Sequence, residues 1–169
     1  SFDIINNPSL ACIEVDDVTY ANTNWTSIDS QHVFNTVCSS QQITLIPDQN
    51  FEQALINQNI DSDGVINGQV FTADINTLTI LNLNNSSITD LTGIEDFTDL
   101  NKLFCSNNQI TSIDLSQNSA LSELYCYDNQ LTSLNITQNT LLINLNCSDN
   151  QISNLDVSQN VNLKDLRFN

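Results

Sequence analysis

Apolar residues recur along the C-terminal part of the chain at a fixed spacing of about 21 residues. The segments LNKLFCSNN, LSELYCYDN, LINLNCSDN and VNLKDLRFN repeat one pattern, and ITSIDLSQN, LTSLNITQN and ISNLDVSQN lie between them with the same period. The leucines that mark the period are Leu100, Leu121, Leu142 and Leu163. A fixed period of this length predicts a solenoid, in which each coil buries its apolar row against its neighbours.

Each phrase has the form LxxLxLxxN, so alternate side chains of a short extended run point inward and the others point out. An asparagine follows each run, where the chain must turn, and its side-chain amide can satisfy backbone groups that a tight bend leaves unpaired. These residues are Asn108, Asn118, Asn129, Asn139, Asn150 and Asn160. We therefore expect structural ladders of asparagine and not a binding motif.

The motif LxxLxCxxN resembles that of the leucine-rich repeat family, in the short-repeat form of secreted and surface proteins of bacteria. The resemblance implies a solenoid of mainly parallel β-strands that binds other macromolecules and carries no chemistry of its own. Because the short repeat leaves little room for an outer helix, we expect flattened coils. Each would have a strand on one side and a strand or an extended segment on the other.

The repeats divide the chain into three predicted parts. Residues 1–40 are expected to form the last half-repeat and the C-terminal cap of a preceding array, because FDIINNPSLACIEV aligns with LDVSQNVNLKDLRF and the period is lost after Val15. Residues 41–75 are predicted to contain a linker, a capping helix and an acidic turn. The helix starts near Pro47, with Phe51, Leu55 and Ile56 on its apolar face. Residues 76–169 are expected to form the main array, which would be uncapped at its C-terminal end.

The acidic turn after the helix is the candidate metal site. Its residues fit the first nine positions of a calcium loop of the EF-hand type, with Gly64 at the bend, and Val70 stands where the bidentate glutamate belongs. Asp74 could supply the missing carboxylate. The candidate ligands are Asn59, Asp61, Asp63, Asn67 and Asp74. Either a structural calcium ion or a turn without metal accounts for the pattern.

Composition, charge and motifs argue against several functions, and the net charge of −17 is the first of these observations. With only three strong bases in 169 residues, nucleic acid would be repelled along most of the surface. No apolar run reaches the roughly 20 residues that span a bilayer, and the opening SFDIINN lacks the features of a signal peptide. No nucleophile, base and oxyanion donor share a recognisable motif, so we do not expect an enzyme.

The five cysteines are of two kinds. Cys105, Cys126 and Cys147 occupy the same inward position in successive coils, which predicts a ladder of buried thiols that pack as small apolar residues. Cys12 and Cys38 lie outside this ladder, and we expect a disulfide between them. Such a bridge, like the family resemblance, indicates an extracellular or cell-surface location.

Outward positions of the first strand in each coil give the candidate binding surface. Aromatic and charged side chains gather there, whereas the opposite row is almost entirely serine, threonine, aspartate and asparagine. The candidate residues are Lys102, Phe104, Glu123, Tyr125 and Tyr127. Exposed aromatic residues are enriched in interfaces, but they also favour the pleated surface of a strand, and both explanations stay open.

The chain begins and ends within a repeat, and the two ends are complementary in phase. One interpretation is an excerpt of a longer secreted protein, in which the chain is a recognition or adhesion scaffold for a protein or a glycan. The alternative is a structural subunit whose copies stack head to tail into a filament. The apolar residues of that contact would be Phe2, Ile4, Leu10, Leu163, Leu166 and Phe168.

Overall fold

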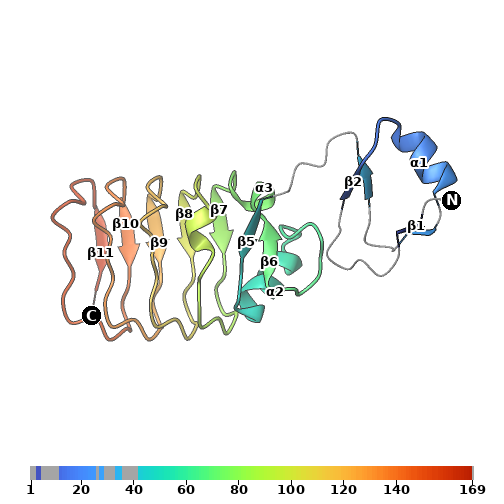
Figure 1. The fold of residues 1–169 in the computed structure, drawn as a ribbon. Helices are drawn as coiled ribbons and strands as arrows, with labels where there is room; N and C mark the ends of the chain where they lie inside the picture. The colour runs from blue at the N-terminus through green and yellow to red at the C-terminus, as the bar shows by residue number, and fades with distance from the viewer. Residues whose placement is uncertain (1–2, 5–11, 26, 29–32, 36–41, 169) are drawn as a thin grey trace. The chain divides into compact units, whose positions relative to one another are not determined.

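The computed structural model describes residues 3–4, 12–25, 27–28, 33–35 and 42–168, and it divides the chain into two compact units, residues 1–41 and 42–169. Each unit is described by itself. The second unit contains the predicted helix, the acidic turn and all of the regular repeats (Figure 1).

The first unit is built on parallel strand pairs. Strand β1 (Asp3–Ile4) pairs with β3 (Ser27–Ile28), and β2 (Cys12–Glu14) pairs with β4 (Val33–Asn35). Cys12 lies opposite Val33, which is the same offset as that of the regular coils, so the prediction that the period is lost after Val15 is wrong for this pair of strands. Helix α1 (Val18–Asn24) interrupts the apolar pattern between them and so hides the period in the sequence.

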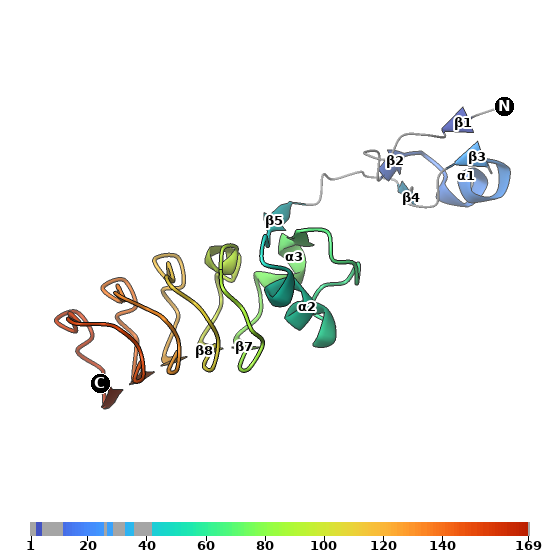
Figure 2. The same ribbon diagram turned by 90° about the horizontal axis from the view of Figure 1, so that it is seen from below.

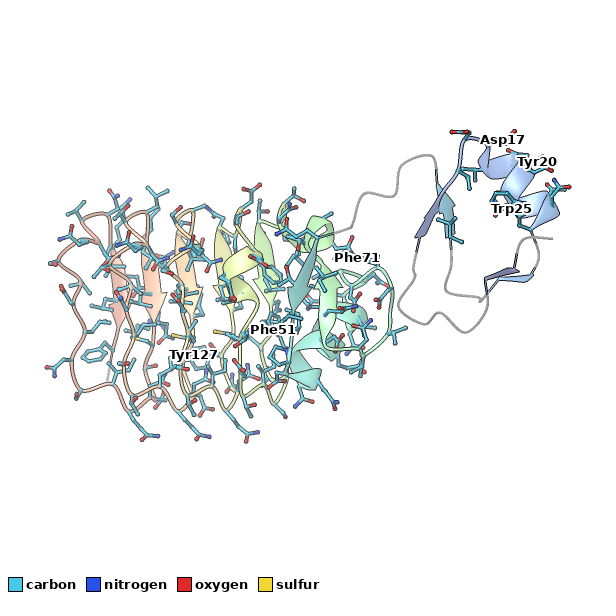
Figure 3. The ribbon with its side chains drawn as sticks, viewed as in Figure 1. Asp17, Tyr20, Trp25, Phe51, Phe71 and Tyr127 are labelled. Carbon is cyan, nitrogen blue, oxygen red and sulfur yellow. The ribbon has the colours of Figure 1, made fainter. Side chains whose placement is uncertain are left out.

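Helix α1 has a local start signal. The side chain of Asp17 accepts a hydrogen bond from the backbone N–H of Tyr20 at 2.9 Å, which caps the N-terminus of the helix. The rings of Tyr20 and Trp25 meet edge to face, with centroids 6.4 Å apart (Figure 3).

The second unit begins with a cap that matches the predicted helix. Helix α2 (Gln49–Asn57) follows Pro47, and one carboxylate oxygen of Asp48 accepts the N–H groups of Asn50 and Phe51. Phe51 and Leu55 are fully buried, whereas Ile56 is half-buried.

The cap also contains a small antiparallel sheet, and the sequence pattern did not predict the pairing of its two strands. Strand β5 (Ile43–Leu45) pairs with β6 (Gln69–Phe71), and the short helix α3 (Thr72–Ile75) follows at once. Val70 is 1% exposed at the centre of β6. This position therefore contributes to the core of the cap.

Five parallel strands form the face of the solenoid, side by side from green to red in Figure 1. They are β7 (Ile80–Asn82), β8 (Lys102–Phe104), β9 (Glu123–Tyr125), β10 (Asn144–Asn146) and β11 (Asp165–Arg167). The step from β7 to β8 is longer by a single residue than the later steps, which all keep the offset that pairs Leu103 with Leu124. Figure 2 shows the successive coils side by side, with the strands along one edge of the row.

The predicted inward positions form a continuous core. Leu81, Leu103, Leu124 and Leu145 are at most 1% exposed, and they stack strand upon strand. Phe51 of the cap stacks on a phenylalanine of the first coil, Phe97, with ring centroids 6.0 Å apart. The cap and the array therefore share one core.

The asparagine ladders are confirmed, and their geometry explains the sequence NN or DN at the end of each strand. Asn107, Asp128 and Asp149 have φ between 53° and 57°, the left-handed conformation that asparagine and aspartate tolerate well. The next residue turns its amide inward. Asn129 donates to the carbonyls of Cys105 and Cys126 at 3.0 and 3.1 Å and accepts from the N–H of Ile110.

The far side of each coil consists of extended segments and turns. Among the described residues after Thr79, all strands belong to the opposite face, so the predicted form with an extended segment on the far side is correct. A second asparagine ladder lies here. Asn139 donates to the carbonyls of Leu115 and Asn118, and Asn160 donates to those of Ile136 and Asn139. Each amide therefore links its own coil to the preceding one.

Candidate functional site

The outward face of β8 and β9 brings four of the five predicted surface residues into two direct pairs. Phe104 and Tyr125 lie opposite each other across the strands and stack, with ring centroids 5.2 Å apart and planes 16° from parallel. Lys102 lies opposite Glu123 and forms an ion pair with it, with 2.7 Å between Nζ and Oε1. Cross-strand pairs of both kinds stabilise a sheet by about 0.2–1 kcal/mol each.

Tyr127 lies outside this stack. It follows β9 by two positions on the same outward side, is half-buried, and has no ring partner among the described aromatic pairs (Figure 3). Among the five predicted surface residues, Tyr127 is thus the one that belongs to neither the aromatic stack nor the ion pair.

A second apolar area lies beside the start of β10 and β11, and the repeat pattern did not predict it. Leu141, Ile143 and Val161 are 51%, 37% and 85% exposed, and they line a shallow groove with Asn162 and Lys164. These residues occupy the turn between coils, where the repeat pattern fixes only one inward leucine per coil. The sequence signal that could have indicated this area is an apolar residue at a turn position other than that of the inward leucine.

The acidic turn is held in place by hydrogen bonds to its carboxylates. The N–H of Ser62 donates to Asp74, that of Val65 donates to Asp63, and the side-chain amide of Asn67 donates to Asp63. Asn59 has a positive φ of 55° and follows the end of α2, where its N–H donates to the carbonyl of Ile56. Asn59 therefore has a structural role in ending the helix.

The residue that organises this turn is Glu52, which the sequence pattern did not single out. Its side chain is fully buried, and its carboxylate accepts the backbone N–H groups of Asn67, Gly68 and Gln69 at 2.8–3.2 Å. A glutamate in the first turn of a helix is ordinarily explained by the helix dipole. The sequence signal that could have indicated a buried role for Glu52 is its position next to Phe51, on the side of the helix that faces the core.

The predicted thiol ladder is confirmed. Cys105, Cys126 and Cys147 are free thiols, at most 1% exposed, and each follows a strand in the same register. Burial raises the pKa of Cys105 to about 12 and that of Cys147 to about 11, and it raises the pKa of Cys126 well above its ordinary value. These thiols act as core residues and are poor nucleophiles.

We expect the three ladder thiols to resist labelling by a thiol-specific reagent at pH 8 in the native protein and to react fully in about 6 M guanidinium chloride. Mass mapping of the labelled cysteines is the measurement. The same experiment tests the predicted bridge between Cys12 and Cys38, whose side chains lie outside the described residues. Without reductant, the unfolded chain should expose three thiols if the bridge exists and five if it does not.

The predicted end-to-end contact is only partly visible. Leu163 is half-buried, Leu166 in β11 is 43% exposed, and Phe168, directly after β11, is 38% exposed. Phe2, Leu10 and the side chain of Ile4 lie outside the described residues. Head-to-tail stacking therefore stays a prediction.

None of the described helices is long and apolar enough to cross a membrane. The second unit consists of stacked coils with a row of parallel strands on one side and a continuous buried core, and several known proteins have this arrangement.

The relatives share both the repeat and its architecture. The chain is 38% identical to internalin J of Listeria monocytogenes over 129 residues, which cover 70% of this chain and 14% of that protein. The chain is a leucine-rich repeat protein. No family model matches it.

Solved structures agree with this assignment. The functional domain of InlJ from Listeria monocytogenes, described as including a cysteine ladder, has a TM-score of 0.65 at 40% identity and covers 77% of this chain and 29% of that one. The internalin InlF of the same species has a TM-score of 0.58 at 26% identity, over 70% and 34% of the two chains. The leucine-rich repeat chain thus spans less than a third of the InlJ structure and about a seventh of internalin J.

Proposed function

We propose that this leucine-rich repeat chain is a non-enzymatic extracellular scaffold that binds a protein partner through the outward face of its strands. The observation that supports this most directly is the arrangement on β8 and β9, where an aromatic stack and an ion pair lie next to each other on a rigid sheet. Its homology to internalins, together with the family resemblance to secreted and surface repeat proteins, supports the same role.

The stack favours a protein over a glycan. A sugar ring binds an aromatic side chain by lying flat on the face of the ring. In Phe104 and Tyr125 one face of each ring is covered by the other ring, so the stack leaves at most one face of each ring for a sugar. Ring edges, a phenol and a paired carboxylate suit the mixed apolar and polar contacts of a protein interface.

Charge further defines the partner. The chain has a net charge of −17, and two of its three strong bases, Lys102 and Arg167, are already paired with carboxylates on their own sheet. The long-range field of such a surface accelerates association with a positively charged partner and repels acidic ones. We therefore expect the partner to present a basic patch around an apolar centre.

Replacing the exposed aromatic residues tests this proposal. We expect Tyr125→Ala and Tyr127→Ala each to weaken partner binding by about tenfold or more, because truncation of an aromatic interface anchor costs about 2 kcal/mol. Candidate partners are captured on the immobilised chain from extracellular protein and glycan arrays, and affinities are then measured by surface plasmon resonance at about 0.05 and 0.3 M salt.

Ser133→Ala and Thr137→Ala on the far side of the same coil are the matched controls, because both positions lie away from the strand face. The proposal predicts that these variants bind as the wild type does. Equal loss in the far-side variants, or selective binding to glycans, would contradict a protein-binding strand face.

A further inference from the structure

Asp61 carries a buried oxygen that no described group of the chain satisfies. The residue is 3% exposed, and it lies in the turn that follows the end of α2. Its Oδ1 accepts the backbone N–H of Asp63 at 3.2 Å, whereas its Oδ2 is inaccessible to solvent and has no hydrogen-bond donor. A buried carboxylate oxygen without a partner is destabilising by several kcal/mol unless a positive charge compensates it.

No basic side chain among the described residues compensates it. Burial raises the pKa of Asp61, and the charges of the neighbouring carboxylates of Asp63 and Glu52 raise it further. The lysines and the arginine all lie in the strand coils, two of them in ion pairs there. The single histidine, His32, lies outside the described residues. The negative charge at this point of the turn is thus unbalanced by the described protein groups.

The neighbouring carboxylates face the same turn but are partly occupied. Asp74 accepts the N–H of Ser62 through one oxygen, and no described group donates to its other oxygen, whereas Asp63 accepts donors at both of its oxygens. Glu52 is saturated by the N–H groups of residues 67–69. Asp61 and Asp74 are therefore the two carboxylates of the turn with oxygen positions to spare.

We propose that Oδ2 of Asp61 is a ligand of a calcium ion held in the turn between residues 61 and 74, with Asp74 and Asp63 as its acidic neighbours. Among the described residues, no three His, Cys, Asp or Glu side chains converge on one metal position. Backbone carbonyls and water must then complete the shell, which calcium accepts and zinc does not. Magnesium demands a stricter octahedral geometry and gives up its water reluctantly.

The small number of carboxylate ligands sets the expected strength of binding. Calcium sites of extracellular modules, which use few charged ligands, have Kd values of about 0.1–1 mM. The ion would join the end of α2 to the start of α3 and thereby stabilise the cap of the array. It would be a structural ion, and the proposal does not depend on the strand face or its partner.

Calorimetric titration and thermal unfolding of the whole chain test the site after treatment with EDTA. We expect CaCl2 to bind with a Kd of about 0.1–1 mM and about 10 mM CaCl2 to raise the Tm by about 5 °C, because the ion binds only the folded cap. MgCl2 at the same concentration should give less than half of this rise. Absence of binding heat together with an unchanged Tm would overturn the proposal.

Asp61→Asn distinguishes a calcium ligand from a residue that is merely structural. The variant keeps the shape of the side chain and removes its charge, so we expect at least a tenfold weaker Kd for CaCl2 and no loss of Tm in EDTA. Asp114→Asn is the matched control, since Asp114 is an exposed carboxylate that also accepts a backbone N–H two positions on, and it should keep the full calcium response. A full calcium response in Asp61→Asn would refute the assignment.

Asp74→Asn supplies the second variant if Asp61→Asn does not fold. Asp74 is half-buried and accepts the N–H of Ser62, a bond that asparagine can keep through its carbonyl oxygen. The proposal predicts that its Kd for CaCl2 rises by at least about fivefold. An unchanged Kd would contradict the proposed position of the ion beside Asp74.

Discussion

Gly93→Ala is expected to lower the free energy of unfolding by about 3–4 kcal/mol, because it combines backbone strain with overpacking. Gly93 has φ = 102°, which alanine adopts only at a cost. A Cβ at this position would lie 2.5 Å from the carbonyl oxygen of Leu45 and closer still to the side chain of Ile46. The obstructing atoms include backbone, so a rotamer change cannot relieve the clash.

The location of Gly93 makes the effect large. Leu45 ends β5 in the cap, and Ile46 is fully buried, whereas Gly93 precedes the 3-10 turn η1 (Ile94–Asp96) of the first coil. An added methyl group at this contact would push the cap and the array apart. A loss of this size is a large part of the roughly 5–15 kcal/mol that stabilises a typical domain, and the Tm should fall by about 10 °C or more.

Gly68→Ala is the control that separates strain from overpacking. Gly68 has φ = 83°, but no heavy atom lies within 4 Å of a Cβ built there. We expect a loss of about 1–2 kcal/mol from the backbone alone. Thermal and urea unfolding of both variants measure the difference, and equal losses would show that the contact with β5 does not resist a methyl group.

The regular coils could be predicted from the sequence because every inward position is repeated. Leu103, Leu124 and Leu145 read as one row, and the asparagine after each strand marks the bend, so spacing alone determined the register. The ladder of thiols followed from the same reasoning. Repetition converts a long-range contact between coils into a local rule with a constant offset along the chain.

The cap was harder to predict because its contacts occur once. Val70 was considered only as the position where a calcium loop lacks its glutamate, whereas it pairs with Thr44 in an antiparallel sheet. The role of Glu52 depends on donors 15 to 17 residues away, and no period relates them. In the first unit, α1 lies between β2 and β4 and interrupts the apolar pattern, so the offset between these two strands could not be predicted from the sequence.

The candidate binding surface was predicted as a set of positions but not as pairs. Alternation along a strand places Phe104 and Tyr125 on one face, and the register of the repeat places them side by side. Whether the rings stack or spread depends on their side-chain rotamers, which the sequence pattern does not determine. The proposed preference for a protein partner over a glycan rests on this stack.

Glu52→Gln is expected to lower the free energy of unfolding by about 3 kcal/mol, because hydrogen bonds to a charged acceptor contribute about 1.5–3 kcal/mol each and the substitution removes the charge from three of them. Glutamine keeps the shape of the side chain, but a neutral carbonyl oxygen would replace the charged Oε1 that accepts from Asn67, Gly68 and Gln69. Its amide nitrogen would take the place of Oε2, which also accepts the N–H of Gly68, so two donors would face each other there.

Glu95→Gln provides the control for the loss of charge. Glu95 is half-buried and accepts a single backbone N–H, that of Gly93, which the carbonyl oxygen of glutamine can also accept. We expect a loss below about 1 kcal/mol there. Urea unfolding compares the two variants. If Glu52→Gln loses no more free energy of unfolding than Glu95→Gln, Glu52 does not stabilise the turn at residues 67–69 in the way expected.

Hydrogen exchange locates where the Glu52→Gln variant opens. Residues 67–69 lead into β6, and the carbonyl of Gly68 accepts the N–H of Ile46, so the carboxylate of Glu52 connects α2 to both strands of the cap sheet. Local opening draws on the least stable contacts of a structure. The amides of Ile46 and residues 67–69 should therefore exchange faster in the variant, while those of the β8–β10 strands keep wild-type protection. Uniform loss of protection across the array would instead mean that the cap and the coils unfold as one unit, with Glu52 contributing to global stability and not to closure of the turn.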